Sequence, residues 1–198
     1  AGTSVTASST TDAVVFSLNG VNYTSGTLTG NTSVADSLSV SGTSSIVGAT
    51  LTNIGNLTIV TGAIITMTVT QHTAFASTTT ASGTETITIN ATDGDMTTIA
   101  SISNYVFGDD STNTRTVTVS AAGTSVTASS GSDAITFTLS GLTYTGTYIG
   151  AGTNDIATLA TGANIAGATL TNVTNLTVAT GGSVTMTAAQ NNAFTNTI

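Results

Sequence analysis

The stretch GATLTNIGNLTIVTGAIITMTVTQHTAF, Gly48 to Phe75, decides the fold, because the chain contains it a second time. It returns as GATLTNVTNLTVATGGSVTMTAAQNNAF, Gly167 to Phe194, with 17 of the 28 positions identical. In NLTIV and in IITMTVT (residues 64–70), apolar residues alternate with Thr. A period of two is the pattern of a β-strand with one buried face. The stretch therefore predicts strands, with Thr on their outer faces and Leu, Ile, Met and Val inside.

The repetition extends beyond this stretch. AGTSVTASSTTDAVVFSLNGVNYTSG, from Ala1, returns from Ala122 as AGTSVTASSGSDAITFTLSGLTYTGT, an offset of 121, whereas the later stretch has an offset of 119. Internal similarity at a fixed period is the sequence signature of repeat architectures. We therefore expect repeat units of about 120 residues, the first complete over 1–121 and the second, truncated, over 122–198.

Short strands are expected about every ten residues, separated by Gly, Asn, Asp and Ser. One stretch has a different pattern: in residues 93–110, Met96, Ile99 and Ile102 are spaced by three, which leaves a short helix or a capping loop open. The class is all-β, and the favoured fold is a Thr-rich parallel β-solenoid of the β-helix or β-roll kind, with coils of about 20 residues. Tandem antiparallel β-sandwich domains are the alternative.

Composition excludes several functions. Only 5% of the residues are charged, against about 25% in typical proteins, and the net charge is -8 with a single Arg, a single His and no Lys or Cys. Nucleic acids and anionic membranes are bound through Lys and Arg, so neither is an expected partner. No apolar run reaches the roughly 18 residues of a membrane helix, so membrane insertion is not expected. Without Cys, disulfides and zinc–thiolate sites are excluded.

The segment GSDAITFTLSGLTYTGTYIGAGTNDIATLATGANIAGATLTNVTNLTVATGGSVTMTAAQNNAF, from Gly131, resembles the repetitive β-strand segments of large bacterial surface proteins. Surface-layer proteins and adhesins exported by type I secretion are among these. Within it, GAGTNDIATL, from Gly150, is similar to a degenerate RTX nonapeptide, G-G-x-G-x-D-x-U-x, with one Gly missing and one extra residue before Asp155. The resemblance implies a secreted structural or adhesive β protein, extracellular or at the cell surface, with Ca²⁺ nearby.

Acidic residues in Gly-containing turns are the candidate Ca²⁺ ligands, because Ca²⁺ takes six to eight oxygens from carboxylates and carbonyls. Asp also favours turns for its own backbone hydrogen bonds, which is the structural alternative. The candidate ligands are Asp93, Asp95, Asp109, Asp110, Asp133 and Asp155.

Catalytic chemistry is not expected. His72 is replaced by Asn191 in the second copy, which indicates a surface polar residue rather than a ligand or general base. No G-x-S-x-G motif accompanies the many Ser residues. Only Arg115 could serve the cationic role that polysaccharide lyases need, so no catalytic residue is assigned and the chain is not expected to be an enzyme.

Three functions remain open. The first is a structural protein that self-assembles with copies of itself into a bacterial surface layer, sheath or filament. The second is the stalk or binding region of a giant adhesin, with cell-surface polysaccharide as a candidate partner. The third is an ice-binding solenoid, which requires T-x-T motifs at one fixed spacing on one face.

Overall fold

The computed structural model describes residues 2–8, 11–32, 36–75, 79–81, 83–90, 94–108, 114–128, 134–152 and 154–197. They belong to two compact units, Ala1–Asn90 and Ala91–Ile198. Among the described residues, every strand pairing within a unit is parallel. The chain is therefore an all-β solenoid, as the sequence predicted, and the alternative of antiparallel sandwich domains is wrong.

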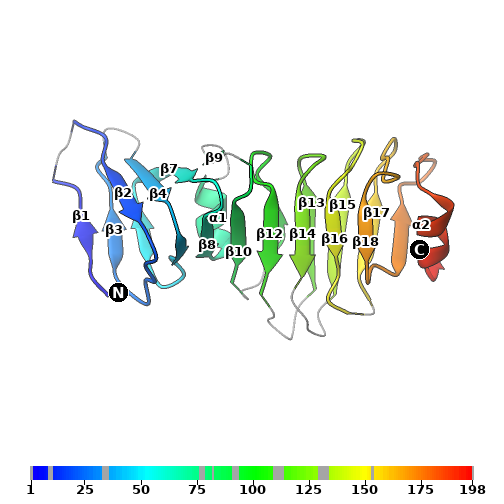
Figure 1. The fold of residues 1–198 in the computed structure, drawn as a ribbon, viewed down its shortest axis with the longest axis horizontal. Coiled ribbons are helices and arrows are strands. Elements are labelled where there is room, and N and C mark those ends of the chain that lie inside the picture. The colour runs from blue at the N-terminus through cyan, green and yellow to red at the C-terminus, as the bar shows by residue number, and fades with distance from the viewer. Residues whose placement is uncertain are drawn as a thin grey trace. The chain divides into compact units, whose positions relative to one another are not determined.

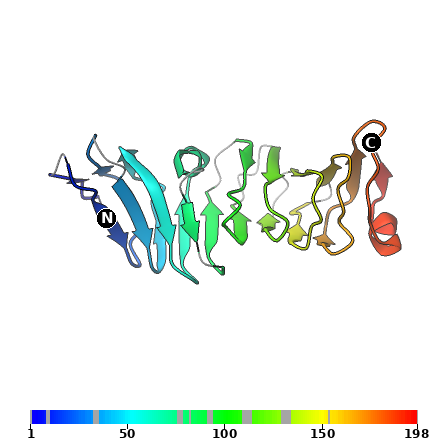
Figure 2. The same cartoon turned by 90° about the horizontal axis from the view of Figure 1, so that it is seen from above.

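The first unit winds through three parallel sheets in turn, and each turn of the chain forms one coil (Figures 1 and 2). The first sheet contains β1 (Val5–Thr6), β3 (Thr27–Thr29) and β6 (Thr50–Thr52). The second contains β2 (Val15–Leu18), β4 (Asp36–Val40), β7 (Ile54–Ile59) and β9 (Thr79–Ala81). In the third lie β5 (Thr43–Ser45), β8 (Ile64–Met67) and β10 (Thr86–Ile89). A short helix, α1 (Val69–Phe75), follows β8.

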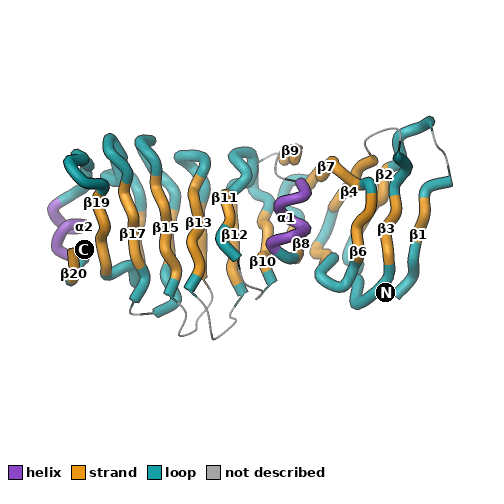
Figure 3. The backbone as a smooth tube through the Cα atoms, turned by 180° about the vertical axis from the view of Figure 1, so that it is seen from behind, coloured by secondary structure: helices purple, strands orange, loops and turns teal. Residues whose placement is uncertain are grey.

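The second unit has the same kind of winding. One face contains β11 (Met96–Thr97), β13 (Arg115–Val119), β15 (Ile135–Leu139), β17 (Ile156–Leu159), β19 (Asn175–Val178) and β20 (Asn196–Thr197) (Figure 3). The opposite turn of each coil contains β12 (Asn104–Phe107), β14 (Ser125–Ala128), β16 (Thr147–Ile149) and β18 (Thr169–Thr171) (Figure 1). Single bridges that join Thr143, Asn164 and Thr185 mark a third side. Helix α2 (Ala188–Ala193) precedes β20.

Coil length follows from the strand register. Leu38 pairs with Leu57, 19 residues later, and Val5 pairs with Leu28, 23 residues later. Because the period of a strand is two, each coil directs every second side chain inward, where it stacks on its equivalent in the next coil. In the second unit one such inward column is completely apolar and buried. It consists of Met96, Val117, Phe137, Ala157 and Leu176.

Aromatic side chains form a further part of the core in the second unit. Tyr148 packs against Phe137 and Tyr144, with ring centroids 5.7 and 6.2 Å apart. Arg115 points inward and is buried, with its guanidinium carbon 5.4 Å from the centre of the Phe107 ring, the geometry of a cation–π contact. The single Arg of the chain therefore belongs to the core rather than to the surface.

Two local expectations differ from the structure. The described part of the stretch 93–110, residues 94–108, contains the strands β11 and β12 rather than a helix. Met96, Ile99 and Ile102 are buried all the same, because the loop between the strands folds over the core. The strand expected over 64–70 ends at Met67, and Val69 begins α1. The boundary between the two compact units falls between Asn90 and Ala91, whereas the second sequence repeat is expected to begin at residue 122. The repeat units therefore remain a prediction from the sequence.

Candidate functional site

Among the described residues, each unit contains one helix, at a position where a regular coil would have a strand. Helix α1 comes one coil after β6, and α2 comes one coil after β18. A glutamine anchors each helix to the preceding coil. The Nε2 of Gln71 donates hydrogen bonds to the carbonyls of Ile46 and Ala49, at 2.7 and 2.8 Å. That of Gln190 donates to the carbonyls of Ile165 and Ala168, at 2.6 and 2.9 Å. These carbonyls would otherwise lack the strand that a regular coil supplies.

Reciprocal hydrogen bonds between a Thr and the same Gln start both helices. In α2, the Gln190 amide donates to the Thr187 hydroxyl at 3.1 Å, and the Thr187 amide donates to Gln190 Oε1 at 2.8 Å. Thr68 and Gln71 make the same pair at the start of α1. This is a capping box, T-x-x-Q, and it is present in both copies of the repeated stretch. The motif is the sequence signal that could have predicted the helices.

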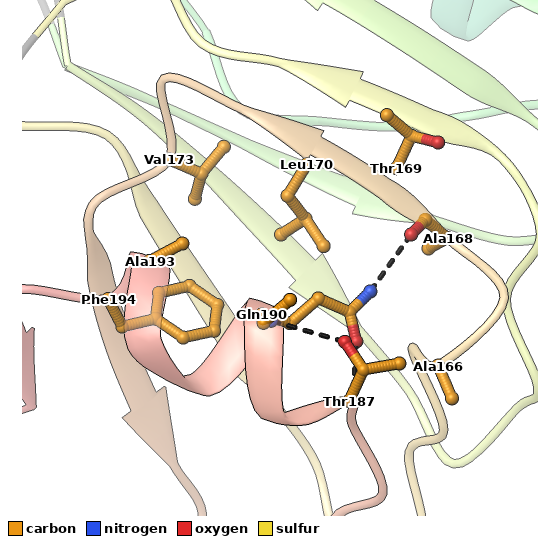
Figure 4. A pocket seen from close by; sticks show the side chains of 10 residues that line it. Ala166, Ala168, Thr169, Leu170, Val173, Thr187, Gln190, Ala193 and Phe194 are labelled. Carbon is orange, nitrogen blue, oxygen red and sulfur yellow. Dashed lines mark hydrogen bonds between the residues drawn. The ribbon is translucent and has the colours of Figure 1, made fainter.

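A small cavity lies beside each helix. In the second unit it measures about 310 Å³ and lies between α2 and β18 (Figure 4). Its lining is Ala166, Ala168, Thr169, Leu170, Val173, Thr187, Ala189, Gln190, Ala193 and Phe194. The first unit has a cavity of about 330 Å³ lined by Val47, Ala49, Thr50, Leu51, Thr68, Thr70, Gln71 and Ala74. Neither lining contains a charged side chain; the polar groups are Thr hydroxyls and the two Gln amides, which are already bonded to backbone.

The two helices differ in how deeply they are buried. Phe75, at the end of α1, is 0% exposed, whereas its counterpart Phe194 after α2 is half-buried. Gln71 is buried and Gln190 is half-buried. The same sequence motif therefore forms part of the core in the first unit and an accessible surface in the second.

His72 was expected at the surface, and that prediction is wrong. It lies in α1 and is 1% exposed. Burial lowers the pKa of His72 to about 4, because a charged imidazolium loses its hydration there. The side chain is neutral at pH 7. The surface position was predicted from Asn191, the equivalent residue of the second copy. Asn191 is indeed exposed to solvent, but His72 is not.

Asp155 is fully buried in a turn, and its two carboxylate oxygens accept backbone hydrogen bonds. The amide of Ile135 donates to Oδ1 at 2.7 Å, and the amide of Gly152 donates to Oδ2 at 2.8 Å. Asp36, 119 positions earlier, is buried in the same way and accepts from the amide of Val14 at 2.6 Å. Asp36 was not among the predicted ligands, although its alignment with Asp155 in the repeat was the signal. Each carboxylate thus joins the start of its own strand segment to the preceding coil.

Of the remaining predicted Ca²⁺ ligands, the structure describes Asp95 alone. Asp95 is exposed, and its Oδ1 accepts the amide of Thr116 in the next coil at 2.7 Å. Asp93, Asp109, Asp110 and Asp133 lie outside the described residues. Within the described ranges, no three His, Cys, Asp or Glu side chains come close enough to hold a metal ion. Ca²⁺ binding therefore stays a prediction.

The outer face of the second unit presents a column of Thr hydroxyls. Parallel register places five Thr at the same position of five successive strands, β11, β13, β15, β17 and β19 (Figure 3). They are Thr97, Thr118, Thr138, Thr158 and Thr177. Each is exposed or half-buried, and paired strands lie about 4.8 Å apart. We call this set the Thr column.

The neighbouring outward position on the same face is less uniform. Thr116 and Thr136 pair with each other across the register of β13 and β15, and Thr136 pairs with Ile156 on β17. Ile156 in turn pairs with Asn175 on β19. No charged side chain occupies either outward position from β13 to β19. From β13 to β19 the face is therefore neutral and made mainly of hydroxyl and methyl groups, with Asn175 buried. Asp95, one residue before β11, adds an exposed carboxylate beside Thr116 at one edge.

Comparison of the chain with family models, with curated proteins and with solved structures finds no match in any of the three. The longest helix among the described residues has seven residues, which is far too short to cross a bilayer.

Proposed function

We propose that this chain is a non-enzymatic structural repeat module that self-assembles outside the cell, in a bacterial surface layer, sheath or filament. The observation that carries the proposal is the Thr column of the second unit, on a face without charged side chains from β13 to β19. Thr hydroxyls both donate and accept hydrogen bonds, and β-branched side chains stay rigid, so such a face is suited to close packing against a like surface.

Net charge supports the same function. Two copies with a charge of -8 each repel one another wherever their acids meet. A face without charge is where copies can approach at the lowest electrostatic cost. Three of the described acids, Asp36, Glu85 and Asp155, are moreover buried, which removes them from the surface that another copy would meet.

Resistance to proteolysis fits an extracellular material. Trypsin-like proteases cleave after Lys or Arg, and the only such residue is Arg115. Its side chain is buried in β13, so a protease must open the coil before it can cut.

We propose the repeat of about 120 residues as the means by which such a material gains length.

Electron microscopy of the purified protein, in millimolar Ca²⁺ and again in chelator, tests the proposal. Filaments or sheets are expected with Ca²⁺, and their loss in chelator would assign Ca²⁺ to the Asp-containing turns, among them Asp93, Asp95, Asp109, Asp110 and Asp133. Isolated particles under both conditions, with a monomer in sedimentation at high concentration, would overturn the self-assembly proposal. The stalk of a giant adhesin, with cell-surface polysaccharide as its partner, would then be the better explanation.

A second candidate, an ice-binding surface, has one observation in its favour. The Thr column recurs once per coil, the fixed spacing that the sequence did not reveal. The adjacent outward position contains T-x-T only on β13 and β15, and Ile156 and Asn175 interrupt it on β17 and β19. Thermal hysteresis of the protein solution tests this candidate, and a freezing point equal to the melting point would exclude it.

A further inference from the structure

The proposal of self-assembly leaves open which surface makes the contact. We infer that the Thr column of the second unit is the interface with a second copy of this chain, an inference that rests on the proposed function. The partner is identified by chemistry: a neutral array of groups that each donate and accept is complementary to itself, whereas a charged ligand finds no counter-charge on it.

The other broad face of the second unit makes a useful comparison. At one outward register position of this face, each strand contributes one residue. Strands β12, β14, β16 and β18 contribute Val106, Thr127, Ile149 and Thr171 in that order. Thr and aliphatic residues alternate there from coil to coil. Among the described strands, only the Thr column repeats one side chain on five strands in succession. Other Thr pairs, such as Thr147 and Thr169 on β16 and β18, form shorter runs, so the longest row of identical hydroxyls at the strand spacing is the Thr column.

Symmetry identifies the residue to test. When a face pairs with itself, the contact is isologous, and the residue nearest the two-fold axis meets its own counterpart. Thr138 lies on β15, the middle strand of the five, so it is expected nearest that axis. The chain contains no Cys, so a single introduced Cys reports one position alone.

The first experiment compares Thr138→Cys with Thr127→Cys under mild oxidation. Thr127 lies on β14, on the other face, and is likewise half-buried. A disulfide requires Cα atoms less than about 7 Å apart. We expect a covalent dimer from the Thr138 variant at least tenfold faster than from the Thr127 variant. Equal rates, or a faster reaction of Thr127→Cys, would overturn the inference.

Sedimentation velocity of Thr138→Lys and Thr127→Lys gives an independent measurement. Each change lowers the net negative charge by one, so a non-specific charge effect would strengthen association equally in both. We expect Thr138→Lys to weaken self-association at least tenfold, because a lysine ammonium in the contact would lose its hydration without a partner. Thr127→Lys should associate like the unmodified chain, and circular dichroism establishes that both variants fold.

The outcomes separate this inference from the proposed function. An unmodified chain that stays monomeric refutes both. An unmodified chain that associates, together with a Thr138→Lys variant that associates equally well, refutes only the assignment of this face.

Discussion

The buried His72 makes the stability of the first unit depend on pH in a defined direction. In the unfolded chain its imidazole titrates near pH 6.5, whereas burial in the folded protein lowers the pKa of His72 to about 4. Between these values the unfolded state binds one more proton than the folded state. Stability is therefore complete above about pH 6.5 and falls as the pH drops towards 4.

The size of the effect follows from the two pKa values. At about 1.4 kcal/mol for each pH unit, the interval from 6.5 to about 4 corresponds to roughly 3 kcal/mol. A loss of that size is a large part of the 5–15 kcal/mol that typically stabilises a domain. Carboxylates titrate in the lower part of the same range, so the histidine contribution has to be isolated by a variant.

The matched variant is His72→Asn, the residue found at the equivalent position 191. Urea unfolding of both proteins, followed by circular dichroism from pH 7 to pH 4.5, should show a steeper loss in the unmodified chain. The difference should approach 1.4 kcal/mol for each pH unit below 6.5. Because the chain has one His, its imidazole proton resonances can be titrated directly by NMR. A folded-state pKa near 6.5, or parallel stability curves for the two proteins, would refute the reasoning.

Three further predictions concern single contacts, each measured by chemical denaturation. Gln71→Ala should cost about 1–3 kcal/mol because it removes the side-chain donor from the Ala49 carbonyl and leaves the Ile46 carbonyl with the Ala49 amide alone, and Gln190→Ala should cost less because its helix is partly exposed; equal costs would contradict the difference in burial. Asn172 has a φ of 58°, in the left-handed region, so Asn172→Ala should cost about 1 kcal/mol and Asn172→Gly almost nothing. Asp155→Asn should cost about 2–4 kcal/mol in chelator, because one oxygen that accepts a backbone amide is replaced by a donor; stability lost only when Ca²⁺ is present would point to a metal ligand instead.

Alternation in the repeated stretch was sufficient to predict the strand class and the inward residues. Leu57, Ile59, Ile65 and Met67 are all buried, and Thr58 is exposed, as the period of two required. The parallel pairing also agreed with the expected coil length. These features are local or strictly periodic, so one chain contains the information for them.

Other features depend on contacts that no local pattern reports. His72 and Asn191 are equivalent in sequence but differ in burial, since what surrounds each helix decides its exposure. The Thr column was hidden because its members are 19–21 residues apart and the T-x-T motifs around them are irregular in sequence. Only the register of the strands aligns them.

The stacking of coils also determines how each unit bears load. A coil in a solenoid makes hydrogen bonds only with the coil before it and the coil after it. Tension at a terminus therefore acts on one ladder at a time, and the outermost coil detaches while the next remains intact. Twenty residues span at most about 70 Å when fully extended. A unit of this kind is therefore expected to lengthen in successive steps under tension, and each released coil absorbs work before the next begins to yield.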